Sequence, residues 1–165
     1  MAEDLLELTH IPTGASPLSI ATNRLSQLLR AQLTDLLKQN GNIGLPIWRI
    51  YTGLAEMNEA TQKQLATFTR IEQSHISRAL AQLEDRGELL SRRCDEDKRA
   101  RRFCFTPTGR ENYERLLPIV ELFYQNIDGA FSPEEIALYL ELTERLAQAA
   151  LSSASAAEQT SKLTA

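Results

Sequence analysis

The sequence predicts a mainly α-helical protein with one small β-hairpin, an α+β fold. Over most of the chain, apolar residues recur every three or four positions, which is the spacing of one helix face. The period changes after Leu89, where two short segments flank a polar stretch. The helical pattern resumes after Phe105 and continues to about Leu151. These three observations place one hairpin inside a helical chain.

The first long helix is predicted over residues 17–39. Residues 1–16 are polar, contain Pro and Gly, and are expected to be a flexible segment. Ser16 and Pro17 then form a helix start, because Ser caps a first turn and Pro fits the first helical position. An apolar stripe follows for roughly six turns. This is longer than a lone small domain requires, so part of the stripe is expected to face a second subunit.

Three shorter helices are predicted next. One opens at Pro46, the second runs from Thr61 to about Phe68, and the third runs from about Gln73 to Arg86 with Gly87 as its cap. On the third helix one apolar face is expected to pack toward the second helix and the turn. The residues of this contact are Ile76, Leu80 and Leu83 on one side and Leu65, Phe68 and Ile71 on the other.

The hairpin and two further helices complete the chain. Leu89 to Cys94 and Arg99 to Phe105 are the expected strands, and a helix follows Thr106-Pro107-Thr108-Gly109. The last helix starts at Ser132-Pro133-Glu134-Glu135, where Ser132 and Glu135 complete a capping box, and is expected to end near Leu151. Residues 152–165 lack apolar periodicity and are expected to be a disordered tail.

Composition narrows the class of protein. The chain has 165 residues, 42% hydrophobic and 24% charged, and no apolar run approaches the ~20 residues of a membrane span. Its acidic start lacks the features of a signal peptide, so we expect a cytoplasmic protein without membrane contact. Cys94 and Cys104 are too few for a disulfide framework and lack zinc-site spacing.

Catalytic signals are weak. His10 and His75 have no nucleophile or carboxylate partner at motif spacing, and neither a Gly-rich phosphate loop nor a metal-ligand cluster is visible. We therefore expect no enzyme, no metal and no cofactor.

Charge is distributed unevenly. Residues 61–110 contain eleven Lys/Arg and seven Asp/Glu, a net +4, although the whole chain carries −4. A basic segment on an acidic scaffold attracts phosphate locally and orients an encounter with nucleic acid. A merely solvated run of charges is the alternative interpretation, so the motifs must decide.

Two short helices, a tight turn and a basic hairpin are the order of a winged helix-turn-helix, whose second helix lies in the major groove of duplex DNA. The polar face of the second helix offers hydrogen-bonding groups for base edges, and the cations of the hairpin can reach phosphates and the minor groove. The candidate DNA contacts are Thr61, Gln62, Gln73, Ser74, His75, Ser77, Arg78, Arg93, Asp97, Lys98, Arg99 and Arg101.

These motifs resemble the MarR family of bacterial transcriptional regulators over about residues 20–150. The resemblance is carried by Leu45-Pro46-Ile47-Trp48-Arg49, Thr61-Gln62-Lys63-Gln64-Leu65-Ala66, Ser74-His75-Ile76-Ser77-Arg78, Leu83-Glu84-Asp85-Arg86-Gly87, Asp97-Lys98-Arg99 and Phe105-Thr106-Pro107-Thr108-Gly109-Arg110. The wing motif followed by Thr-Pro-x-Gly is the more specific part of this set.

The resemblance implies one domain, 17–151, in a homodimer. Segments 17–44 and 107–151 would intertwine for dimerisation, and 45–106 would form the DNA-binding lobe. It also implies a pseudo-palindromic operator, repression, and release by a small anionic or phenolic ligand. Arg99 would enter the minor groove with Asp97 holding it. The family commonly has Gly where this chain has Arg70, and a left-handed conformation there would cost on the order of 1 kcal/mol.

Three alternatives remain open at this stage. Trp48, Tyr51 and Tyr113 could line an effector cavity, although aromatic residues at helical spacing are more often plain core. Cys94 lies among arginines that favour a thiolate, which would suit an oxidation-sensing regulator. A disulfide with Cys104 is not expected, because a hairpin turning at 95–98 would separate the sulfurs by roughly 15 Å. The fold could also serve protein contacts, with DNA binding lost.

Overall fold

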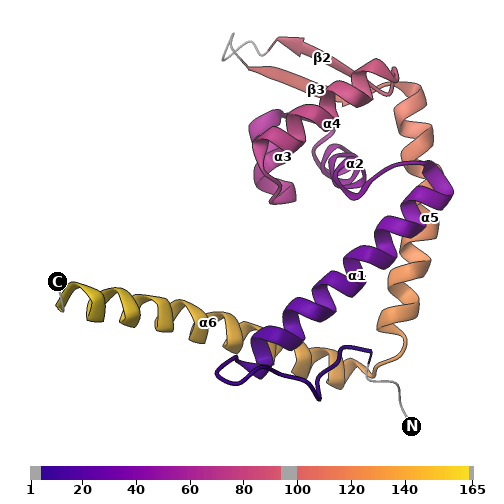
Figure 1. Cartoon of the computed structure of the whole chain (residues 1–165). Helices are drawn as coiled ribbons and strands as arrows, with labels where there is room; N and C mark the ends of the chain where they lie inside the picture. Colours follow the sequence, from indigo (N-terminus) through magenta and orange to yellow (C-terminus); the bar gives the residue numbers. More distant parts are fainter. Residues whose placement is uncertain (1–4, 94–99, 164–165) are drawn as a thin grey trace. The chain divides into compact units, whose positions relative to one another are not determined.

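A computed structural model describes the backbone of residues 5–93 and 100–163 and the side chains as far as Ser153. The chain divides into two compact units, one made of Met1–Leu25 with Tyr124–Ala165 and the other of Ser26–Phe123 (Figure 1). The prediction of helices around one small sheet is confirmed. None of the described helices is long and apolar enough to cross a membrane.

The second unit contains the helix-turn-helix and the hairpin. Along the chain it holds α2 (Leu45–Met57), β1 (Glu59–Thr61), α3 (Gln62–Thr69), α4 (Gln73–Asp85), β2 (Leu89–Arg93) and β3 (Arg101–Phe105), as Figure 1 shows. The helices agree with the predicted ones to within one or two residues. Gly87, with φ +67°, confirms the expected left-handed glycine after α4.

The sheet has one strand more than the sequence predicted. Its order is β1-β3-β2 with antiparallel neighbours, and Ala60 of β1 pairs with Phe103. The strand β1 spans only three residues, too few to display an alternating pattern. In the hairpin, Cys104 pairs with Leu90. Because neighbours along a strand point to opposite faces, Phe103 is buried and Cys104 lies on the other face.

The described buried core lies entirely within the second unit, from Leu33 to Val120. Ile76, Leu80 and Leu83 of α4 are buried together with Leu65 of α3, as predicted. Phe68 is 48% exposed and is not one of the buried core residues. Its ring lies at the edge of the core against Gly53 of α2, where an added Cβ would be 3.2 Å from Phe68 Cδ1.

Two long helices frame this core. The helix α1 (Pro17–Gly41) contributes Leu33 and Leu37, and α5 (Pro107–Asp128) contributes Leu116 and Val120. Arg115 Nη1 of α5 donates a hydrogen bond of 2.7 Å to the Asn40 carbonyl at the end of α1. The start of α1 is capped as predicted, because Ser16 Oγ accepts from the Ser19 amide at 3.3 Å.

The first unit has turns and helices but little core. The segment before α1 is held by Arg24, whose Nη1 donates to the carbonyls of Leu6 and Glu7 at 2.9 and 2.6 Å. The last helix, α6 (Pro133–Leu163), begins with the predicted capping box, in which the Glu135 amide donates to Ser132 Oγ and the Ser132 amide donates to Glu135 Oε2. The hydrogen bond from the Ser132 amide, and after it the Ser132 hydroxyl, lower the pKa of the Glu135 carboxyl.

The sequence predicted that the last helix ends near Leu151, but α6 continues to Leu163. We expected a disordered tail because this segment lacks apolar periodicity. Its Ala, Glu and Gln residues, however, favour a helix even where no apolar face is present. Ser152 and Ser153 also donate their hydroxyls to carbonyls four residues earlier, at 3.0 and 2.8 Å. These bonds satisfy the hydroxyls inside the helix.

Candidate nucleic-acid interface

Local hydrogen bonds cap the start of α3, and a left-handed residue at its end leads into the turn before α4. Thr61 caps α3 by accepting from the Gln64 amide at 3.2 Å, and the Gln64 side chain accepts from the Thr61 amide at 2.8 Å. At the other end, Arg70 adopts the left-handed conformation, with φ 52° and ψ 35°. The turn therefore has the shape that glycine would favour, with an arginine in the strained position.

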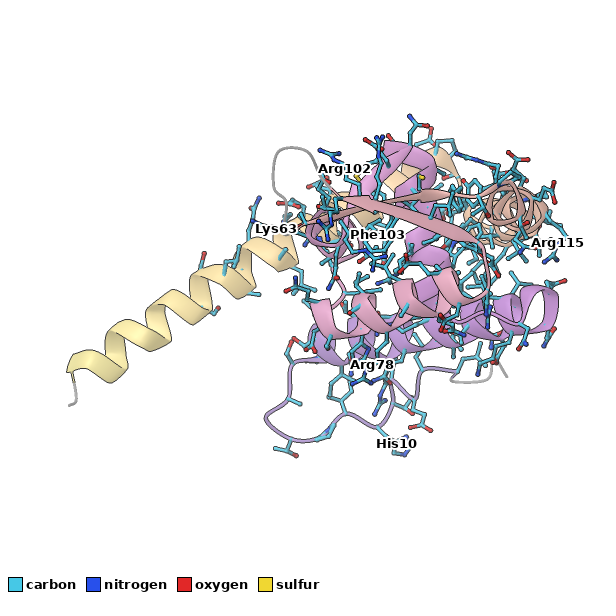
Figure 2. The ribbon with its side chains drawn as sticks, turned by 90° about the horizontal axis from the view of Figure 1, so that it is seen from above. His10, Lys63, Arg78, Arg102, Phe103 and Arg115 are labelled. Carbon is cyan, nitrogen blue, oxygen red and sulfur yellow. The ribbon has the colours of Figure 1, made fainter. Side chains whose placement is uncertain are left out.

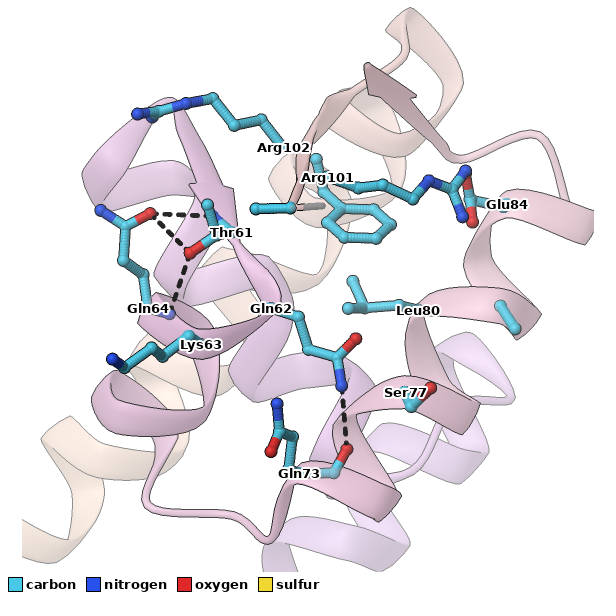
Figure 3. Close-up of a pocket in the computed structure, with 13 residues that line it drawn as sticks. Thr61, Gln62, Lys63, Gln64, Gln73, Ser77, Leu80, Glu84, Arg101 and Arg102 are labelled. Carbon is cyan, nitrogen blue, oxygen red and sulfur yellow. Dashed lines mark hydrogen bonds and ion pairs between the residues drawn. The ribbon is translucent and has the colours of Figure 1, made fainter. Parts of the chain in front are cut away.

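The helix α4 presents a polar face beside a buried one. Gln73, Ser74, His75, Ser77 and Arg78 are all exposed, as the sequence predicted. The buried side of the helix consists of Ile76, Ala79, Leu80 and Leu83. Gln62 Nε2 donates to the Gln73 carbonyl at 3.3 Å, so it links the beginnings of α3 and α4 (Figure 3). The apolar contacts thus fix which side chains α4 offers outward.

A groove of about 590 Å³ lies between the start of α3, the length of α4 and strand β3 (Figure 3). It brings together predicted contact residues from all three elements, among them Thr61, Gln62, Gln73, Ser77 and Arg101. Lys63, which we did not single out as a contact, also lines it and is exposed. This groove joins the helix-turn-helix to the wing on one surface.

A second pocket, of about 230 Å³, lies on another side of α4. It is lined by His75, Arg78, Ala79 and Gln82 of α4 and by the beginning of α2. Figure 2 shows Arg78 and Phe103 on opposite sides of α4, which agrees with their membership of different pockets. The predicted contacts on α4 are therefore spread around its outward face.

Among the described residues of the wing, three arginines form ion pairs within the chain. Arg101 Nη2 lies 2.7 Å from Glu84 Oε1. Arg92 and Arg102 both contact the Glu59 carboxylate, with 3.6 Å between Arg102 Nη1 and Glu59 Oε1. The sequence did not identify Glu59 or Glu84 as a partner of these arginines, because both glutamates lie on other elements and at no characteristic spacing from the wing.

The remaining wing residues divide into two groups. Arg93 is exposed at the end of β2. Asp97, Lys98, Arg99 and Cys94 lie outside the described residues, so their predicted roles stay predictions.

The other cysteine, Cys104, has a free thiol that is partly buried, with Sγ 3.9 Å from the Leu90 carbonyl oxygen. Within the described part of the chain, no cluster of His, Cys, Asp and Glu could hold a metal ion.

The base of the wing explains the Thr-Pro-x-Gly motif. Thr106 Oγ1 donates to the Gly87 carbonyl at 2.7 Å and accepts from the Gly109 amide at 3.1 Å. The Thr106 amide donates to the Glu88 carbonyl at 3.0 Å. A Cβ on Gly109 would overlap this same carbonyl oxygen. Threonine and glycine are therefore required where strand β3 enters α5 beside the end of α4.

Trp48, Tyr51 and Tyr113 form one aromatic cluster with Phe105. The Trp48 and Tyr113 rings stack with centroids 5.6 Å apart, and the Phe105 and Tyr113 centroids are 5.9 Å apart. Trp48 and Tyr51 are buried, and neither pocket described above is lined by these rings. The cluster is part of the core of the lobe, so a ligand role for its members remains a prediction.

Tyr51 also carries a buried polar contact. Its hydroxyl donates to the carboxylate of Glu88, whose side chain is buried beside the cluster. Burial raises the pKa of Tyr51, and the Glu88 carboxylate raises it further. Burial also raises the pKa of Tyr113. The Tyr51 hydroxyl is therefore a protonated donor to Glu88 at neutral pH.

Comparisons with known proteins show which family model and which solved structures this chain resembles. The MarR family model matches residues 45–100. The DNA complex of the MarR-family regulator Sco3205 from Streptomyces coelicolor is 23% identical, with TM-score 0.72, over 84% of this chain and 91% of that one.

Two ligand complexes have the same fold. The regulator PcaV from Streptomyces coelicolor, bound to its natural ligand, is 21% identical with TM-score 0.68, over 84% of this chain and 99% of that one. NadR in complex with 4-hydroxyphenylacetate is 25% identical with TM-score 0.66, over 84% and 97%. Residues 45–100 therefore match the MarR family model, and the chain has the same fold as the MarR-family transcriptional regulators.

Proposed function

We propose that this chain is a homodimeric transcriptional regulator that binds duplex DNA through α4 and the wing. One observation carries the proposal: the exposed polar face of α4 and the arginine-rich strand β3 bound the same open groove. Side chains of this length and chemistry suit base edges in a major groove, and the exposed Arg93 at the end of the neighbouring strand β2 suits the adjoining phosphates. The DNA-bound Sco3205 structure, with the same fold, supports this assignment.

The roles of the residues follow from their positions. Gln73, Ser74, His75, Ser77 and Arg78 would meet base edges, since they lie on the exposed face of the first half of α4. Thr61 and Gln62 lie at the start of α3, where helix amide groups suit a phosphate. The wing residues Arg93, Lys98 and Arg99 would contact phosphates and the minor groove, with Asp97 positioning Arg99.

The dimer is proposed from the apolar residues of the first unit. Among residues 5–25 and 124–153 no side chain is buried. Yet large apolar side chains there are about half exposed or more, namely Leu18, Phe131, Leu138, Tyr139, Leu140, Leu142 and Leu151. A surface this apolar indicates a protein partner. A second copy fits best, because a two-fold dimer would present two reading helices to an inverted repeat with half-sites about 10 bp apart.

Light scattering tests the dimer. Full-length protein at micromolar concentration should give about twice the chain mass of 18.5 kDa. The double variant Leu138→Glu with Leu142→Glu should give the chain mass, because it places charges in the apolar face. The control variant Thr143→Glu with Gln148→Glu adds the same charge at exposed polar positions of α6 and should stay dimeric. A wild-type monomer that persists in the presence of DNA would contradict the proposal.

Repression with release by a small phenolic or anionic effector is the finer part of the proposal. The aromatic cluster supports it, since Arg110 lies over Phe105 with its guanidinium carbon 4.7 Å from the ring centroid. Aromatic surfaces beside a cation suit an aromatic anion. Titrating 4-hydroxyphenylacetate and hydroxybenzoates into the DNA complex tests this part. We expect at least one to release DNA and to do so less well with the Tyr113→Ala variant.

Selection of bound fragments from the source genome tests DNA binding itself. We expect recovery of duplexes that share an inverted repeat, with affinity that falls steeply as salt rises. Folded dimeric protein that retains no duplex at any salt concentration would favour the alternative function, a winged-helix module for protein contacts.

A further inference from the structure

Glu84, Ser91 and Arg101 form a hydrogen-bonded network at the junction of three elements. Arg101 Nη2 of β3 donates to Glu84 Oε1 of α4 at 2.7 Å and also to Ser91 Oγ of β2. The Ser91 hydroxyl donates to the same Glu84 oxygen at 2.6 Å. The guanidinium also lies over the Phe103 ring, 5.4 Å from its centroid. This network links α4 directly to both long strands of the wing.

The network lies in line with the reading face of α4. Glu84 follows Ser77 by seven residues, about two helical turns, so both side chains project to the same side of the helix. Both line the groove, and Figure 3 shows the Arg101 side chain extending along it to the Glu84 carboxylate. This network of Glu84, Ser91 and Arg101, which we call the clamp, therefore joins the helix side of the groove to its wing side.

The geometry does not suit Arg101 as a phosphate contact. Its guanidinium is directed at a carboxylate and a hydroxyl of its own chain, whereas Arg102 points away from it (Figure 3). The side chains of the pair are 56% and 25% exposed, and ion pairs this exposed contribute little to stability. What the network does provide is a direct polar link between α4 and the wing, beside the buried contacts of Leu83, Leu89 and Phe103.

We propose that Glu84, Ser91 and Arg101 act as positioning residues that set the spacing between major-groove and minor-groove contacts. The protein would then recognise, in addition to sequence, the number of base pairs between the bases read by α4 and the flank read by the wing. One inserted base pair moves the flank by about 3.4 Å, more than the tolerance of a hydrogen bond. This inference rests on the proposed DNA-binding function.

The test compares matched duplexes. One carries the operator recovered by fragment selection, and the other carries an extra base pair between the bases protected by α4 and the minor-groove flank in each half-site. The measured quantity is the ratio of the two dissociation constants for each variant. Removing a carboxylate raises affinity for all DNA through charge, but this effect cancels in the ratio.

For the wild-type protein we expect the insertion to weaken binding about tenfold or more. For Glu84→Ala the ratio should fall below about threefold, because an unclamped wing can follow the displaced flank. The swap Glu84→Arg with Arg101→Glu rebuilds the pair and should restore the wild-type ratio. The control Glu59→Gln disrupts the other ion pairs of the wing and should leave the ratio unchanged, since Glu59 lies on β1 and not on α4.

Each outcome decides a separate point. If Glu84→Ala and Ser91→Ala both give the same ratio as the wild-type protein, the clamp is overturned while DNA binding stays intact. A ratio near one for the wild-type protein itself has the same consequence. Ser91→Ala covers the case in which Glu84→Ala fails to fold, judged by circular dichroism. No binding of any duplex by the wild-type protein would instead contradict the proposed function itself.

Discussion

Replacing Gly109 with alanine should destabilise the protein, although helix propensity alone predicts the opposite. Gly109 lies in the first turn of α5, where alanine would be favoured by about 1 kcal/mol. The added Cβ, however, would overlap the Glu88 carbonyl oxygen and lie 2.9 Å from its carbon and 3.1 Å from Phe105 Cδ1. The chain must therefore move where strand β3 joins α5.

That movement disturbs two hydrogen bonds at the base of the wing. The Thr106 amide donates to the Glu88 carbonyl at 3.0 Å, and Thr106 Oγ1 donates to the Gly87 carbonyl at 2.7 Å. Each bond contributes about 1 kcal/mol, and overpacking a close contact costs about 1–3 kcal/mol. After the gain in helix propensity, we expect a net loss of about 2–4 kcal/mol.

Urea unfolding at one fixed chain concentration measures this loss, since the proposed dimer would make stability depend on concentration. The matched control is Gly87→Ala, where φ is +67° and no atom lies within 4 Å of the added Cβ. It should cost about 1 kcal/mol from backbone strain alone. The reasoning is refuted if Gly109→Ala is as stable as the wild type, or more stable than Gly87→Ala.

Three further predictions concern single contacts. Arg70→Gly should stabilise the protein by about 1 kcal/mol in urea unfolding by relieving the left-handed backbone, whereas Arg70→Ala keeps the Cβ and should not. Tyr51→Phe should lower stability by about 1–3 kcal/mol, because the buried Glu88 carboxylate loses its donor, and adding Glu88→Leu should recover much of the loss. The lowered pKa of Glu135 means that its capping contribution is present at neutral pH and lost as pH falls through the folded-state pKa. The stability difference between wild type and Glu135→Gln should therefore shrink on acidification, and a constant difference would contradict that linkage.

The helices were predictable because each carries its own signals. Residues Ser16, Ser132 and Gly87 mark helix ends by hydrogen-bonding and backbone preferences that act within a few positions. The apolar face of α4 was also predictable, since burial at i, i+4 and i+7 follows directly from helix geometry. The exposed polar face, and with it much of the candidate site, followed from this arrangement.

Features that depend on distant parts of the chain were not predictable. The strand β1 has only Ala60 buried, and its pairing with Phe103 is a tertiary event. The Arg101 and Glu84 side chains are 17 positions apart, and Arg92 and Glu59 are 33 apart, so no local pattern reveals either pair. Sequence reasoning therefore assigned Arg101 to phosphate, whereas the structure directs it toward α4.

The central claim is that α4 reads bases while the wing anchors the protein on phosphates. Binding isotherms for Arg78→Ala and Arg93→Ala on the selected operator and on a scrambled duplex, over a salt series, test it most directly. Arg145→Ala, which removes one cation from α6, serves as the control. Arg78→Ala should lose about 1–3 kcal/mol on the operator and little on the scrambled duplex. Arg93→Ala should lose equally on both and reduce the salt slope by about one. Equal losses on both duplexes for both variants would contradict the claim.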